Sequence, residues 1–129
     1  MKKIVFFSLL ASLFVLFHSC RKEDDKVAET IVNIKVQDIS GAKQGVTVYM
    51  FKKDRGPGTT FFKPFFTDKT VVTESNGVAT FKLQEVYDLE VINHQSTLYF
   101  GVFDNNTPIG HVGVTIEKGQ TKSATINLQ

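Results

Sequence analysis

The sequence predicts an all-β protein, an antiparallel Greek-key β-sandwich of seven or eight short strands. Three observations lead to this fold class. Apolar and polar residues alternate along several short runs, which is the period of a strand with one buried face. Turn-forming residues separate these runs at short intervals. No stretch of ten or more residues between positions 30 and 129 shows a helical period.

The stretch Val71–Val91 is the clearest part of this pattern. Two runs of β-forming residues flank Asn76-Gly77, the dipeptide that most readily takes the positive φ angles of a tight hairpin turn. A third run follows and alternates equally well. The residues expected to face the core along these runs are Ala79, Phe81, Leu83, Tyr87, Leu89 and Val91.

Five further strands are expected on the same grounds, at Ile31–Asp38, Val46–Lys52, Thr97–Asp104, Ile109–Glu117 and Thr121–Leu128. The last two are expected to pair with each other. The run Val46–Lys52 is apolar on both faces at its end, which indicates a central strand or one covered by a loop. The inward residues of the first and last strands are Val32, Ile34, Val36, Ala124, Ile126 and Leu128, and the turn after Asp104 is expected at residues 105–108.

Residues 1–19 are expected to be a secretory signal peptide. Lys2 and Lys3 give a positive start, and the apolar run Ile4–Phe17 is too short for a comfortable membrane span. Cys20, the only cysteine, follows directly. Removal of the signal leaves as many basic as acidic residues, so the sequence pI of 8.7 indicates no nucleic-acid binding.

The segment Leu16–Cys20 resembles the lipobox of bacterial lipoproteins, in a loose form. The resemblance implies that the thiol of Cys20 carries a diacylglyceryl group and becomes the N-terminus after cleavage. Several acyl chains, at roughly 0.8 kcal/mol per buried CH₂, anchor a protein durably. The alternative, a free cysteine behind an ordinary signal peptide, leaves a reactive thiol in an oxidising compartment.

Residues 20–29 are interpreted as the lipid-anchor cysteine and a charged tether. The run Arg21–Lys26 is a solvated linker on any interpretation. It also resembles the export signals of Gram-negative surface lipoproteins, which implies display at the outer membrane surface of the cell envelope.

Four short motifs follow one another in the folded part, at Val36–Gly41, Gly45–Val48, Thr73–Phe81 and Tyr87–Val91. Together they resemble the transthyretin-like (prealbumin-like), carboxypeptidase-regulatory and Cna-B types of β-sandwich, an architecture shared with immunoglobulin-like domains. The resemblance implies one domain over residues 30–129 and a role as a stalk, adhesin module or accessory domain at a cell surface. Function itself does not follow from the fold.

No catalytic, cofactor or metal site is indicated, and the chain is not expected to be an enzyme. His94 and His111 lie in separate elements, without the partners that a general base or a metal site requires. The transthyretin-like hydroxyisourate hydrolases end in Tyr-Arg-Gly-Ser, whereas this chain ends at 126–129 in Ile-Asn-Leu-Gln, so that activity is not implied.

Two other constellations are interpreted as structural. Some Cna-B-like domains carry a Lys–Asn isopeptide bond, and Lys35 and Asn127 stand in suggestive strands. Alternation places both opposite the core, whereas the bond requires a desolvated lysine, so none is expected. The oxygens of Asp104-Asn105-Asn106 are interpreted as a turn rather than a calcium site.

The segment Phe61–Phe66 is the most informative departure from the strand pattern. Four phenylalanines, Phe61, Phe62, Phe65 and Phe66, surround Lys63-Pro64 in a stretch expected to be a loop or an edge strand. One interpretation is that this loop folds back and caps the open edge of the core. The other is an exposed apolar patch that binds a partner, and a protein is favoured over a glycan because the chain has no tryptophan.

The sequence therefore predicts a lipid-anchored, non-catalytic binding or accessory module that contacts another envelope protein. A purely structural envelope component and a glycan-binding module are the alternatives.

Overall fold

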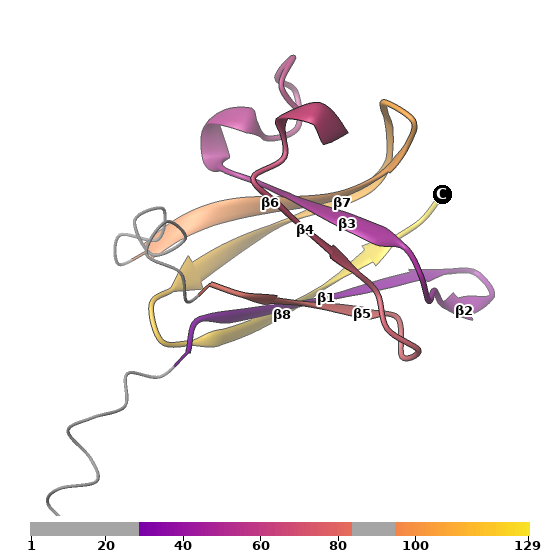
Figure 1. Ribbon diagram of the computed structural model, residues 1–129, viewed down its shortest axis with the longest axis horizontal. Coiled ribbons are helices and arrows are strands. Elements are labelled where there is room, and N and C mark those ends of the chain that lie inside the picture. The colour runs from indigo at the N-terminus through magenta and orange to yellow at the C-terminus, as the bar shows by residue number, and fades with distance from the viewer. Residues whose placement is uncertain (1–28, 84–94) are drawn as a thin grey trace, which may run out of the picture.

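The computed structural model describes residues 29–83 and 95–129, which form two β-sheets packed face to face (Figure 1). Sheet A contains β1 (Ile31–Asp38), β2 (Gly41–Ala42), β5 (Val78–Lys82) and β8 (Thr121–Asn127). Sheet B contains, in spatial order, β4 (Lys69–Val72), β3 (Thr47–Phe51), β6 (Gln95–Asp104) and β7 (Thr107–Glu117). The 3₁₀ turns η1 (Lys53–Arg55) and η2 (Pro64–Phe66) lie between β3 and β4. The predicted all-β sandwich is confirmed.

Side-chain alternation builds the core between the sheets, as predicted. The three inward residues of β1, which are Val32, Ile34 and Val36, are completely buried. Phe81 of sheet A and Phe100 of sheet B meet edge to face, with ring centroids 4.9 Å apart. The other buried apolar residues of this core are Val48, Met50, Ala79, Leu83, Leu98, Val102, Val114, Ile116 and Ile126.

The Asn76-Gly77 turn forms, but the predicted hairpin does not. Gly77 has a φ of +77°, and its amide donates to the carbonyl of Glu74 at 2.9 Å. The strand before this turn, β4, pairs with β3 in sheet B, and the strand after it, β5, pairs with β1 in sheet A. Both runs bury one face in the same core from opposite sides, so the turn carries the chain from one sheet to the other.

The predicted pairing of the last two strands is also wrong, because these two strands belong to different sheets. β7 pairs with β6 in sheet B, whereas β8 runs parallel to β1 from Thr121 opposite Ile31 to Asn127 opposite Gln37. Among the described strands, the sandwich therefore contains one parallel pair beside antiparallel ones. A short connection between two apolar runs indicates where the chain reverses, and the shared core decides which sheet receives each run.

The turn between β6 and β7 is shorter than predicted. Asn105 takes a positive φ of 56°, and Thr107 and Pro108 already belong to β7. Pro108 lies opposite Phe103, beside an irregularity in the pairing register. Proline is tolerated there because β7 is an edge strand and a bulge interrupts the ladder.

The tip between β1 and β2 is held by polar contacts around Asp38. The Asp38 carboxylate accepts hydrogen bonds from the Ser40 amide at 2.8 Å and the Ser40 hydroxyl at 2.6 Å. The Lys43 ammonium lies 2.8 Å from the other carboxylate oxygen. These contacts hold Ile39 at the tip of the turn, where it is completely exposed.

We expect the Asp38 carboxyl to titrate far below its ordinary range. Hydrogen bonds from Lys43 and then Ser40 stabilise the carboxylate and lower the pKa of Asp38 from 3.8 to about 2. A lowered pKa in the folded state means that this contribution to stability is complete above pH 3.8 and is lost as the pH falls through 2. An NMR titration of the carboxyl carbon should show the low midpoint, and Lys43→Gln should raise it. A midpoint at the ordinary value would show that the turn is open in solution.

Several predictions lie outside the described residues. These are the signal peptide, the lipidation site Cys20, most of the tether, the strand expected around Tyr87–Val91, and His94. Within residues 29–83 and 95–129, no helix is long and apolar enough to cross a bilayer.

Candidate functional site

A second apolar layer lies on the outer face of sheet B. Phe51 points away from the sandwich core, yet it is completely buried. The connection between β3 and β4 folds back over this face and carries η1 and η2, drawn above sheet B in Figure 1. The prediction that the end of Val46–Lys52 is covered by a loop is confirmed, and β3 is also an inner strand of its sheet.

Phe62 anchors the loop to the sheet. Its side chain is 6% exposed, and its ring lies 4.8 Å from that of Phe51 and 5.0 Å from that of Phe103, measured between centroids. The backbone beneath it belongs to Gly101, where a Cβ would stand 2.8 Å from the Phe62 ring. Glycine in β6 therefore lets this ring lie directly on the sheet.

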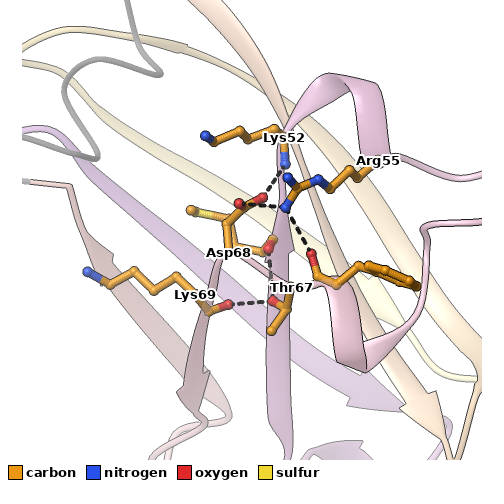
Figure 2. Close-up of polar contacts among 7 residues, drawn as sticks. Lys52, Arg55, Thr67, Asp68 and Lys69 are labelled. Carbon is orange, nitrogen blue, oxygen red and sulfur yellow. Dashed lines mark hydrogen bonds and ion pairs between the residues drawn. The ribbon is translucent and has the colours of Figure 1, made fainter.

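A polar clasp, formed by Lys52, Arg55, Thr67 and Asp68, ties the two ends of the loop together (Figure 2). One carboxylate oxygen of Asp68 accepts from the Lys52 amide at 3.0 Å, and the other accepts from the Arg55 guanidinium at 3.1 Å. The Asp68 side chain is only 2% exposed, so these bonds replace its hydration. Arg55 also reaches the carbonyl of Phe66 at 3.4 Å.

The clasp is fastened to the end of β3. The Thr67 hydroxyl lies 2.9 Å from the carbonyls of both Met50 and Lys69, and the Asp68 amide donates to the Met50 carbonyl at 2.9 Å. The loop thus begins and ends at the same point of sheet B. Its conformation is held by hydrogen bonds at the base and by Phe62 at the centre.

The remaining phenylalanines of the segment form an exposed group, which we call the aromatic cluster: Phe61, Phe65 and Phe66. Phe61 is 47% and Phe65 87% exposed. The half-buried ring of Phe66 stands between them, 5.2 Å from Phe61 and 5.1 Å from Phe65, in edge-to-face contacts. Pro64 starts η2 with its fixed φ, and its carbonyl accepts from the Thr67 amide.

The four phenylalanines predicted as one contact site therefore divide into two groups. Phe62 is a buried anchor and offers no surface to a partner, which corrects its assignment. The loop covers the outer face of sheet B rather than the open edge of the core. Phe103 of β6 was the missed signal, because an aromatic residue on the outward side of an inner strand requires a cover.

The other candidate residues do not converge on a reaction site. The exposed His111 lies edge-on to Phe62, with ring centroids 5.8 Å apart. Lys35 and Asn127 lie on the outer face of sheet A, as predicted, and the Asn127 side-chain oxygen accepts from Gln37 at 2.9 Å. In the part of the chain that the structure describes, no three His, Cys, Asp or Glu residues lie close enough together to hold a metal ion.

Two of the open hollows formed by the described residues lie on the sheet surfaces. One, of about 320 Å³, is lined by Lys53, Ser96, Thr97 and Thr115 beside η1. The other, of about 300 Å³, lies on sheet A and is lined by Asn33, Lys35, Val78, Ser123, Ala124 and Thr125. Both linings carry ammonium and hydroxyl groups, and neither brings a general acid and a general base together.

No family model matches the sequence, and no curated protein matches it as a relative. Solved structures similar to this chain include GBS52, the minor pilin of Streptococcus agalactiae, at 16% identity and a TM-score of 0.47, covering 78% of this chain and 44% of that one. The Bacillus anthracis TIE protein matches at 8% identity and a TM-score of 0.43, covering 78% and 17%. A mutant of the catechol 1,2-dioxygenase of Acinetobacter radioresistens matches at 14% identity and 0.42, covering 83% and 53%. This chain thus spans about half or less of those chains, and likeness at this level carries no functional argument.

Proposed function

We propose that this protein is a lipid-anchored, non-catalytic binding module of a bacterial cell envelope that contacts a protein partner through the aromatic cluster. The anchor is Cys20, directly after the signal peptide, and the charged tether joins it to the sandwich. The proposal includes display at the outer membrane surface, which is supported by the charges of Arg21–Lys26.

A single observation carries the binding role: Phe65 is 87% exposed on a segment that is otherwise firmly held. A phenylalanine that merely covered a core would turn its ring inward, as Phe62 does. Aromatic residues are among the side chains that contribute most to protein interfaces. A held loop also loses little conformational freedom on binding, which favours affinity.

The experiment is a crosslinking pull-down of the full-length acylated protein from native envelopes. Wild type is expected to capture a specific protein, and Phe61→Ser/Phe65→Ser should lose it while circular dichroism and the melting temperature stay close to those of wild type. The expected loss is at least tenfold, because truncating interface anchors costs about 2 kcal/mol or more.

Ile39→Ser is the matched control, because it also removes a fully exposed apolar side chain but from the distant β1–β2 tip. Capture should survive this change. If both variants lose the partner equally, capture reflects nonspecific binding through exposed apolar side chains. If the double variant still captures it, the aromatic cluster is not the contact site, and a wild type that captures no protein would favour a structural component or a glycan ligand.

A further inference from the structure

We infer that the partner's contact surface is acidic, with carboxylates bordering the apolar groove that receives the aromatic cluster. The inference rests on the proposed function, and it concerns the chemistry of the partner rather than its existence. It follows from which charged side chains of the loop are exposed and which are buried.

The loop that carries the exposed rings also carries exposed lysines. Lys63 is exposed and stands in the chain between the two most exposed rings, two residues from Phe61 and two from Phe65. Its amide donates to the Phe61 carbonyl at 2.9 Å, so the backbone turns tightly between these two residues. Lys53 is also exposed on this loop, at the start of η1, where it lines the hollow with Thr97 and Thr115.

The acidic residues of the loop do not balance these charges at the surface. Asp68 is turned inward, with a side chain 2% exposed, and its charge meets that of Arg55 in the clasp. Asp54, next to Lys53, is the exposed acid of the segment from 52 to 69. The exposed face of the loop therefore combines apolar rings with net positive charge, and its complement is apolar with net negative charge.

The same observations disfavour one other occupant. A second copy that used the same patch would set Lys63 of each chain against the other, since a two-fold contact brings equal surfaces together.

The test is photo-crosslinking in washed native envelopes with full-length protein that carries Phe65→benzoylphenylalanine. This substitution keeps an aromatic ring at the most exposed position and bonds to whatever touches it. A protein adduct is expected, and its crosslinked peptide should contain aspartate or glutamate next to apolar residues. Adding Lys53→Glu/Lys63→Glu should lower the adduct yield roughly tenfold, and high salt should lower the wild-type yield.

Lys35→Glu/Lys82→Glu is the matched charge control, because both lysines are exposed on strands of sheet A. It should leave the yield unchanged. A protein adduct that is indifferent to salt and to Lys53→Glu/Lys63→Glu would overturn the acidic partner but leave the proposed function intact. A lipid adduct, a homodimer or no adduct would overturn both.

Discussion

Phe62→Ala is expected to lower the free energy of unfolding by about 3 to 5 kcal/mol, which is the usual cost of removing a buried phenylalanine. The ring is 6% exposed and packs against Phe51 and Phe103, so its loss leaves a cavity and opens the outer face of sheet B to water. A domain of this size is stable by about 5 to 15 kcal/mol, so the change removes a large share. Urea denaturation of the purified protein, followed by circular dichroism, measures it.

Phe65→Ala is the matched control, because it removes the same side chain from a position that is 87% exposed. Its effect on stability should stay within about 0.5 kcal/mol. Losses of about 3 to 5 kcal/mol for both Phe62→Ala and Phe65→Ala would mean that both rings are buried in solution, and the aromatic cluster would then not exist as a surface.

Asp68→Ala is expected to destabilise the protein by about 2 to 3 kcal/mol, because it removes the acceptor of two hydrogen bonds of the clasp. Their donors are the Lys52 amide and the guanidinium of Arg55, which keeps its contact with the Phe66 carbonyl. Arg55 is 38% exposed and stays partly hydrated, which keeps the expected cost below that of a fully buried pair. Urea denaturation measures this change as well.

Asp68→Asn separates charge from shape, since an amide keeps one acceptor oxygen, and it should cost less than Asp68→Ala. Asp54→Ala, which removes an exposed acid of the same loop, should change stability by less than about 0.5 kcal/mol. If Asp68→Ala were as mild as Asp54→Ala, the clasp would contribute little to holding the loop.

The clasp also connects stability with the proposed binding role. Asp68 has no part in the exposed surface, yet it fixes the base from which the aromatic cluster projects. Asp68→Asn should therefore weaken partner capture although every exposed ring remains. Asp68 would then be a positioning residue, and a defect in capture without loss of any ring is the result that a purely structural loop would not produce.

Much of the fold could be predicted from the alternation of apolar and polar residues, because the apolar side chains of a strand identify the face that it buries. The alternating residues of Ile31–Asp38 and Val46–Lys52 lie where their period places them. Pairing could not be predicted in the same way. Asn76-Gly77 shows where the chain turns, but a sandwich offers a turning chain two sheets with equal access to the core.

The candidate site, too, could be predicted from the sequence only in part. From the sequence alone, the two glycines, the two prolines and the four phenylalanines of residues 53–66 indicate an irregular, apolar loop outside the regular strands. Only the tertiary structure decides that Phe62 is buried and that Phe61 and Phe65 remain in water. The four side chains are chemically identical, so what separates them is the space above Gly101, between Phe51 and Phe103, into which one ring fits.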